Sequence, residues 1–208
     1  MLEETSVQSF LDKLASNAAT PGGGSAAAVL GAMGAGLLSM VCNLTIGKKA
    51  YAEVEDEMKG ALAEAESLRT QLQANVQADI DAFEQVMSAY AMPRGSDEER
   101  AARSAAIQSA LKTATLVPLE CARACGEVIA LAGTVAEKGN KQVVSDAGVG
   151  VVAAHAALRS AALNVYINTA SINDEAFATE QLEALEAILE ASGRENEVVY
   201  SGVVRALQ

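Results

Sequence analysis

One stretch of this chain constrains the fold more than any other, because residues 14–47 contain no Asp, Glu, Lys or Arg. At a rise of about 1.5 Å per residue, a helix of this length reaches across a lipid bilayer. However, residues 26–46 consist largely of Ala and Gly, which contribute little transfer free energy in comparison with Leu, Ile, Phe and Val. We therefore expect a central helix enclosed by protein on all sides, with small residues that let neighbouring backbones approach closely, and no membrane span.

The composition favours helices throughout the chain. The 208 residues include no Trp and 3% aromatic residues, and they are rich in Ala, Leu, Glu and Gln, which are good helix formers. Half of the residues are apolar, which is enough to bury the core of one domain. No linker is long enough to separate two domains, so we predict a single all-α domain over residues 1–208, folded as a multi-helix bundle.

Helical periodicity and capping signals divide the chain into amphipathic helices around the central one. Apolar residues recur at spacings of three and four over residues 50–90, which predicts one long helix of about 40 residues and about 60 Å. A capping box at Ser96 and Glu99 predicts the next helix start, and Pro118 predicts a kink or a short break within that helix. The other helices are expected to start at Thr5 or Ser6 with a buried apolar stripe, at Ser25, at about Val143 and at Asn173, with a short tail helix after Gly193.

The charge balance and the cysteines limit the partners and the location. The 15 Lys and Arg residues against 27 Asp and Glu residues give a net charge of −12, which repels phosphate backbones, so we expect no nucleic-acid partner. Cys42, Cys121 and Cys125 are too few for a disulfide framework, and with His155 as the only histidine they do not complete a zinc site. The start of the chain lacks the basic and apolar regions of a signal peptide. We expect a cytoplasmic protein without a bound metal.

Several polar residues lie among apolar neighbours and therefore need partners. Asp79 falls at the edge of the apolar stripe of the long helix, where an unpaired carboxylate is costly. Asp146, next to Ser145, opens an otherwise apolar helix and either stabilises its N-terminus or contacts a ligand. Asn164 and Asn168 lie four residues apart on one helix face, so their amides require hydrogen-bond partners in the protein or in a ligand.

A glycine-rich loop precedes the charge-free helix, and two lysines follow it. Residues 21–24 read Pro-Gly-Gly-Gly and lack the Lys-Ser/Thr ending of a P-loop, so nucleotide binding has little support. The glycines let a ligand approach bare backbone beside the unpaired N–H groups of a helix N-terminus, although an ordinary tight turn explains the same residues. Lys48 and Lys49 suit the C-terminal end of the helix dipole and would equally hold an anionic ligand.

Taken in order, these segments resemble the cyclodeaminase/cyclohydrolase family. This family includes formiminotetrahydrofolate cyclodeaminase domains and stand-alone methenyltetrahydrofolate cyclohydrolases, and the resemblance covers nearly the whole chain. It implies an all-α homodimer that binds folate among its helices. The family often carries a basic residue where this chain has Tyr166, so one charge contact to the substrate is absent or supplied elsewhere. The segments that carry the resemblance are 21–26 (PGGGSA), 44–51 (LTIGKKAY), 79–83 (DIDAF), 117–119 (VPL), Asn140 with 145–148 (SDAG), and 164–168 (NVYIN).

The resemblance implies hydrolysis of 5,10-methenyltetrahydrofolate to 10-formyltetrahydrofolate, which requires no metal or redox cofactor. A carboxylate beside the bridging carbon would stabilise the cation and accept a proton from water, and a second group would protonate the departing N5. We assign Asp79 to the first role, and Asp146 and Lys48 to the second. Asp81, about 200° around the helix from Asp79, is the alternative carboxylate. The expected substrate-binding residues are Gly23, Gly24, Ser25, Asn140, Ser145, Asn164 and Asn168, with Lys49 or Lys141 for the carboxylates of the glutamate tail.

Two alternatives remain at this point. In cyclodeamination, N10 attacks a 5-formimino carbon and ammonia leaves through a closely related tetrahedral centre, and the motifs do not separate this reaction from hydrolysis. The absence of an attached formiminotransferase domain favours the hydrolase, since nothing in this chain would generate the formimino substrate. The alternative from another class is a non-catalytic helical dimer that binds folate.

Overall fold

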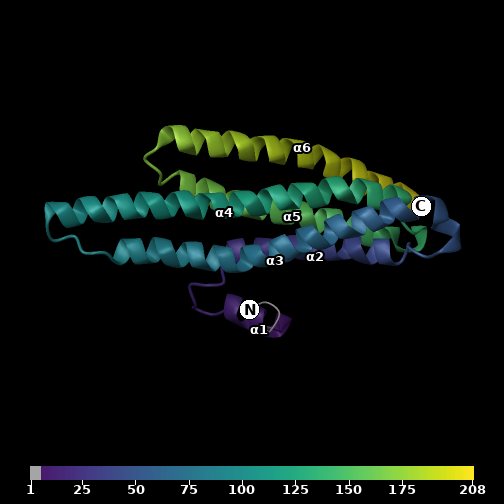
Figure 1. Cartoon of the computed structure of the whole chain (residues 1–208), viewed down its shortest axis with the longest axis horizontal. Coiled ribbons are helices and arrows are strands. Elements are labelled where there is room, and N and C mark those ends of the chain that lie inside the picture. Colours follow the sequence, from purple (N-terminus) through teal and green to yellow (C-terminus); the bar gives the residue numbers. More distant parts are fainter. Residues whose placement is uncertain (1–5) are drawn as a thin grey trace.

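The computed structural model describes residues 6–208 as an elongated bundle of long helices (Figure 1). The described residues contain no strand, so the predicted all-α class is confirmed. Thr5, one of the two predicted caps of the first helix, lies outside the described residues. The helices are α1 (Val7–Leu14), α2 (Gly23–Asn43), the 3-10 helix η2 (Lys49–Val54), α3 (Glu55–Ala91), α4 (Asp97–Lys138), the 3-10 helix η3 (Lys141–Val143), α5 (Val144–Thr169) and α6 (Glu175–Leu207).

The charge-free helix α2 packs against α3, α4 and α5. The predicted close approach of small residues is confirmed, because a Cβ atom at Gly34 would lie 2.9 Å from the carbonyl oxygen of Gly150. The prediction that α2 is enclosed on all sides is wrong. Met33 and Met40 on its outer side are 62% and 44% exposed. Both α2 and the segment Lys141–Thr169 are long and apolar enough to cross a membrane, and 61% and 50% of their apolar windows are buried within the bundle.

Three helices are long and uninterrupted, where the sequence predicts one such helix. Besides α3 with 37 residues, α4 has 42 and α6 has 33. Pro118 does not interrupt α4, although proline removes one helical N–H donor. The carbonyl oxygen of Ala114, four residues earlier, instead accepts a hydrogen bond from Asn168 Nδ2 at 2.6 Å. The neighbouring helix therefore supplies the donor that Pro118 lacks.

The predicted break at Gly193 is also wrong, because α6 continues through this residue. A single glycine within a helix is unfavourable by only about 1 kcal/mol. Ser192, Asn196 and Val199 are buried on either side of it, and α6 packs against α4 and α5. Asp174, and not Asn173, caps the start of α6, since its side chain accepts a hydrogen bond from the Phe177 N–H.

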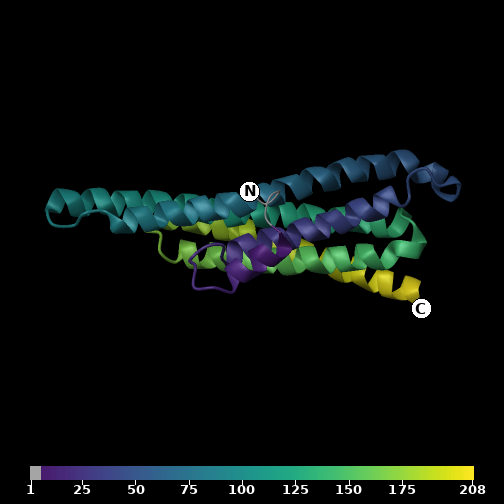
Figure 2. The same ribbon diagram turned by 90° about the horizontal axis from the view of Figure 1, so that it is seen from below.

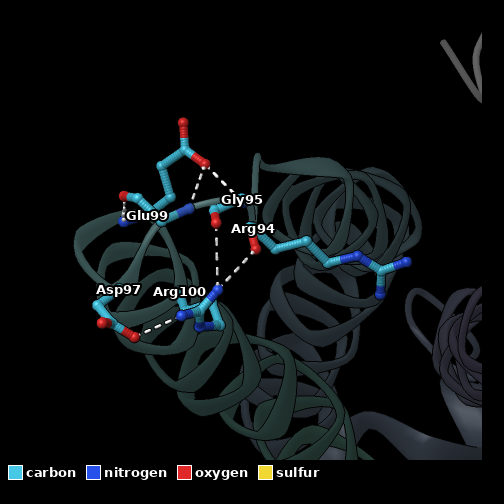
Figure 3. Close-up of polar contacts among 6 residues, drawn as sticks. Arg94, Gly95, Asp97, Glu99 and Arg100 are labelled. Atoms are coloured by element: carbon cyan, nitrogen blue, oxygen red, sulfur yellow. Dashed lines mark hydrogen bonds and ion pairs between the residues drawn. The ribbon is translucent and has the colours of Figure 1, made fainter.

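The turn between α3 and α4 lies at the far end of the bundle, where this pair of helices extends beyond the others (Figure 1). Figure 3 shows how the predicted capping box is made: Glu99 Oε2 accepts from the N–H groups of Gly95 at 2.6 Å and Ser96 at 3.1 Å. Arg100 pairs with Asp97 and donates to the carbonyl oxygens of Arg94 and Gly95. Local signals in the sequence therefore fix this turn, as predicted.

Helix α1 stands apart from the long helices, below α2 and α3 in the view of Figure 1. Ser6 caps it as predicted, because its hydroxyl accepts from the Ser9 N–H at 3.0 Å. The predicted burial of its apolar stripe is wrong, since no residue of α1 is buried. Val7 and Leu11 are 77% and 50% exposed, and Phe10 packs against the main core.

Candidate functional site at the start of helix α2

The carboxylate of Asp79 on α3 lies against the first turn of α2. The buried Ser25 donates its hydroxyl to Asp79 Oδ2 at 2.7 Å. A Cβ atom at Gly24 would lie 2.7 Å from Asp79 Cγ, so only glycine lets the carboxylate approach this closely. The prediction that Ser25 caps α2 is wrong, because α2 begins at Gly23, Gly22 is its N-cap, and the hydroxyl of Ser25 is bonded to Asp79.

The charge of Asp79 has two favourable contacts within the chain. The first turn of α2 holds no acidic residue and has no side-chain cap, so Asp79 supplies from α3 the negative charge that a helix N-terminus favours. The Ser25 hydroxyl is its hydrogen-bond donor. The ion pairs within residues 6–208 all lie elsewhere. A half-buried carboxylate that lacks a cation from its own chain suits a cationic ligand.

A pocket of about 480 Å³ lies between α2 and α5 on the other side of the same turn. Its volume is within the range of about 300–1,000 Å³ that is typical of small-molecule sites. Asn164 Nδ2 donates to the carbonyl oxygen of Ser160 at 3.0 Å, so the amide oxygen of Asn164 is the polar group it offers to a ligand. The pocket is lined by Gly23, Ala26, Ala27, Leu30, Ser160, Leu163, Asn164 and Ile167.

At the opposite end of α2, a second polar cluster joins two loops. Asn140 is buried, and its Nδ2 donates to the carbonyl oxygen of Leu44 at 2.9 Å. The backbone N–H of Asn140 donates to Thr45 Oγ1 at 2.9 Å. The Tyr51 hydroxyl donates to Asn140 Oδ1 at 3.4 Å and accepts from the Lys141 N–H at 3.0 Å. Thr45 and Tyr51 belong to the segment 44–51 that carries the family resemblance, but no role was predicted for either residue.

One chain does not bring all three predicted catalytic residues together. Lys48 follows the C-terminal end of α2, whose 21 residues put it about 30 Å from the start of that helix. Asp146 and Ser145 lie in the first turn of α5, just after Asn140, and therefore at the same end as Lys48. Asp79 is thus grouped with Gly23, Gly24, Ser25 and Asn164, while Lys48, Lys49, Asp146, Ser145, Asn140 and Lys141 form the distant group.

Other predicted residues have partners within the protein. Asp81 is exposed and accepts from Gln77 Nε2 at 2.6 Å, and it lines a different cavity, of about 780 Å³, between α3 and α4. Lys141 Nζ donates to the carbonyl oxygens of Ala136 and Glu137 at the end of α4. Asn168 uses its amide nitrogen on Ala114, as described above. One further polar group was missed by the sequence analysis: Asn75 Nδ2, one turn before Asp79, is buried without a hydrogen-bond partner.

The three cysteines and His155 lie apart from this site in their role as well as in their surroundings. All three cysteines are free and buried. Burial raises the pKa of Cys42 to about 11, and a hydrogen bond with Cys121 together with burial raises the pKa of Cys125. Burial and the charge of Arg159 lower the pKa of His155, so its imidazole is neutral near pH 7. Within residues 6–208, no three His, Cys, Asp or Glu side chains gather in a way that could hold a metal ion.

The fold and the site define the class of protein: an all-α domain with a small-molecule pocket and a half-buried acid at the start of one helix. The family model described as formiminotransferase-cyclodeaminase matches residues 6–187. The chain belongs to this family, which confirms the resemblance carried by its sequence segments.

Individual relatives agree with this assignment. The chain is 57% identical over 203 residues to a methenyltetrahydrofolate cyclohydrolase from Methylorubrum extorquens, with 98% of each protein covered. It is 31% identical over 189 residues to a formimidoyltransferase-cyclodeaminase from Mus musculus, which covers 91% of this chain and 35% of the mouse protein. A crystal structure of formiminotetrahydrofolate cyclodeaminase from Thermotoga maritima matches with a TM-score of 0.84 and 35% identity, covering 100% of this chain and 98% of that one.

Proposed function

We propose that this protein is a methenyltetrahydrofolate cyclohydrolase, which converts 5,10-methenyltetrahydrofolate and water reversibly to 10-formyltetrahydrofolate. The observation that carries the proposal is the Asp79 carboxylate, which lies against Ser25 and Gly24 at the start of α2 and forms no ion pair within residues 6–208. The 57% identity to a cyclohydrolase over 98% of both chains supports the choice of reaction.

The chemistry of the substrate requires such a carboxylate. In the methenyl form, one carbon bridges N5 and N10 and carries a delocalised positive charge, which Asp79 stabilises electrostatically. Water adds to this carbon, and Asp79 accepts one of its protons. The bond between the carbon and N5 then breaks, N5 takes up a proton, and the carbon remains on N10 as a formyl group. One proton is released overall, and no electrons are transferred.

The pocket between α2 and α5 has the size and the polar groups for the ring end of a folate. Gly23 lines this pocket, and the first turn of α2 has no side-chain cap, so its unpaired N–H groups are available to carbonyl or amide oxygens of a ligand. The amide oxygen of Asn164 accepts from a ring N–H. Of the two lysines proposed for the glutamate tail, Lys141 caps the end of α4 and Lys49 follows the opposite end of α2, so neither lies beside this pocket within one chain.

The test of this proposal is the loss of the methenyl absorbance with purified protein. We expect Asp79→Asn to lower kcat by about 10²–10⁴, because the shape of the side chain is kept and its charge and basicity are lost. Glu84→Gln removes an exposed carboxylate from the same helix and is the matched control, which should keep wild-type turnover. Near-normal turnover by a folded Asp79→Asn variant would reject Asp79 as the catalytic carboxylate.

A second candidate reaction is cyclodeamination, and one observation favours it. The solved structure that matches over the whole chain with a TM-score of 0.84 is described as a formiminotetrahydrofolate cyclodeaminase. With 5-formiminotetrahydrofolate as substrate, this activity forms the methenyl chromophore and releases ammonia, whereas hydrolysis removes the chromophore. Ligand binding without turnover of either substrate would instead favour a non-catalytic folate-binding protein.

The proposal also includes a homodimer in the cytoplasm that works without a metal. Free, buried thiols are typical of proteins from a reducing compartment. Several large apolar side chains on α2 and α5 are exposed, among them Met33, Leu163 and Ile167, which supports association of two copies. Turnover that persists after treatment with a chelator is the expected result for a metal-independent enzyme.

A further inference from the structure

Helix α3 carries an aromatic ring one turn beyond Asp79. Leu72 and Asp79 mark the face of α3 that meets α2, since each lies against a glycine of that helix. Phe83 follows Asp79 by four residues and continues this face. Because α2 begins at Gly23, beside Asp79, Phe83 lies past the start of α2, where α3 runs on toward its turn with α4 (Figure 1 and Figure 2). The ring of Phe83 therefore lies on a part of α3 that α2 does not cover.

The ring of Phe83 is packed on one side and open on the other. Phe83 is 37% exposed, so the protein covers most of the residue and leaves part of it to solvent. Asp79 is also partly buried. Side chains four residues apart on a helix are neighbours, with Cβ atoms about 5–6 Å apart. The open part of the ring and the carboxylate of Asp79 are therefore close enough to contact one ligand together.

Aromatic rings elsewhere in this chain hold cations. The Lys112 ammonium, for example, lies 5.0 Å from the centroid of the Phe177 ring. A ring face attracts a cation because the quadrupole of the ring places negative charge there. Within residues 6–208, no such cation lies over Phe83, and Asp79 forms no ion pair. Two neighbouring groups that favour positive charge thus both lack a cation from this part of the chain.

The two segments that meet at this site supply no positive charge of their own. Residues 70–93 contain the acids Asp79, Asp81 and Glu84 but no Lys or Arg, and residues 14–47 contain no charged residue. The net charge of −12 adds a long-range attraction for positively charged ligands. The open ring adds a flat apolar surface. Asp79 and Phe83 together therefore favour a planar cation over a neutral or anionic ligand.

The substrate of the proposed reaction has this character. In 5,10-methenyltetrahydrofolate the positive charge is delocalised over N5, the bridging carbon and N10, which lie in one plane. The product 10-formyltetrahydrofolate has no charge at these atoms, because addition of water and cleavage of the bond to N5 leave a neutral formyl group on N10. A ring face that attracts cations therefore distinguishes substrate from product at the group where they differ.

We propose that Phe83 is a specificity-determining residue of the active site, whose ring lies against the cationic N5–carbon–N10 group of the substrate beside the Asp79 carboxylate. The inference rests on the proposed function. The positive charge disappears as water adds to the carbon, so the ring stabilises the bound substrate more than the transition state. Phe83 therefore sets the affinity for the methenyl form, whereas Asp79 acts on the rate of the chemical step.

The test replaces Phe83 by mono-, di- and trifluorinated phenylalanine, introduced at this one codon. Fluorine withdraws charge from the ring face and changes the shape of the side chain very little. The KM for 5,10-methenyltetrahydrofolate should rise stepwise, by about 3- to 30-fold for the trifluorinated ring, while kcat stays nearly constant. The inhibition constant of 10-formyltetrahydrofolate should not change. The same analogues at Phe177, whose ring faces Lys112, are the matched control and should leave KM unchanged.

Two ordinary substitutions complete the series. Phe83→Leu keeps an apolar side chain without a ring, and it should raise KM at least as much as the trifluorinated ring does. Phe83→Tyr keeps the ring and should retain the wild-type KM. Tyr200→Leu is the control for the loss of an exposed ring, because Tyr200 is 47% exposed on α6, and it should leave both KM and kcat unchanged. Circular dichroism of each variant checks that the helices are intact.

The outcomes separate this inference from the proposed function. A KM that stays constant across the fluorinated series overturns the role of Phe83, even if Phe83→Leu binds more weakly, because the ring face then holds no cation. Equal weakening of substrate and product by fluorination overturns it as well. A wild-type protein without turnover rejects the proposed function instead. Titration calorimetry of 5,10-methenyltetrahydrofolate across the same series then still decides whether Phe83 holds a planar cation.

Discussion

The hydrogen bond between Asn168 and Ala114 makes a quantitative prediction about helix α4. Pro118 has no N–H, so the carbonyl oxygen of Ala114 has no donor within its own helix. Asn168 Nδ2 fills this place at 2.6 Å, and Ala114 is only 9% exposed. A buried carbonyl oxygen left without a partner is unfavourable by about 1–3 kcal/mol.

We therefore expect Asn168→Leu, which keeps the size of the side chain, to lower the free energy of unfolding by about 1–3 kcal/mol. At about 2–4 °C per kcal/mol for a chain of this size, Tm should fall by roughly 2–12 °C. Pro118→Ala restores the backbone N–H, so the same change in the Pro118→Ala background should alter stability by less than about 0.5 kcal/mol. The coupling between the two positions is the quantity of interest.

The measurement is urea unfolding of the four proteins at one fixed protein concentration, followed by circular dichroism. Asn164→Leu is the matched control, because Asn164 Nδ2 donates to the Ser160 carbonyl, which already accepts the helical N–H of residue 164. Its effect should be small and independent of residue 118. Equal losses from Asn168→Leu in both backgrounds would refute the idea that Asn168 replaces the missing donor of Pro118.

Three further predictions concern single residues. Gly24→Ala should lower turnover by about 10² or more, because the added Cβ displaces the Asp79 carboxylate. Gly60 has open space around it, so the control Gly60→Ala should keep activity and raise the free energy of unfolding in urea by about 0.5–1 kcal/mol. Asn140→Ala should lower Tm by roughly 4–8 °C in calorimetry, since about 2 kcal/mol of buried hydrogen bonding is lost, and an unchanged Tm would contradict this role. Burial lowers the pKa of His155 below 6.5 in the folded protein. The contribution of His155 to the free energy of unfolding is therefore complete above pH 6.5 and is lost as pH falls towards the lower, folded-state pKa. His155→Gln should flatten the pH dependence of the urea midpoint in that window, and an unaltered slope would count against this role.

Much of the fold was predictable because its signals are local. The caps at Ser6 and Ser96 depend on residues within one turn of each other, and the structure has them as predicted. The breaks predicted at Pro118 and Gly193 are absent for the opposite reason. The groups that keep those helices intact come from neighbouring helices, and a single sequence does not show which side chain of α5 will face Pro118.

The same distinction applies to the candidate site. The glycine-rich loop and Asp79 were predicted to matter, and the structure brings them together although Ser25 and Asp79 are 54 residues apart. The role of Ser25 as a cap was wrong, because the nearby carboxylate competes for its hydroxyl. Lys48 and Asp146 were assigned from the chemistry of the reaction and from the segments of the family resemblance, and neither signal shows that the length of α2 separates them from Asp79.

The contact between Gly24 and Asp79 also restricts how related sequences can diverge. Any side chain at position 24 would occupy the space of the carboxylate, so the two positions are free to change only together. A homologue that retains an acid at position 79 is expected to retain glycine at position 24, and one that has lost the acid is free to carry alanine there. Alignment columns for these two positions should therefore covary, even though neither residue is close to the other along the chain.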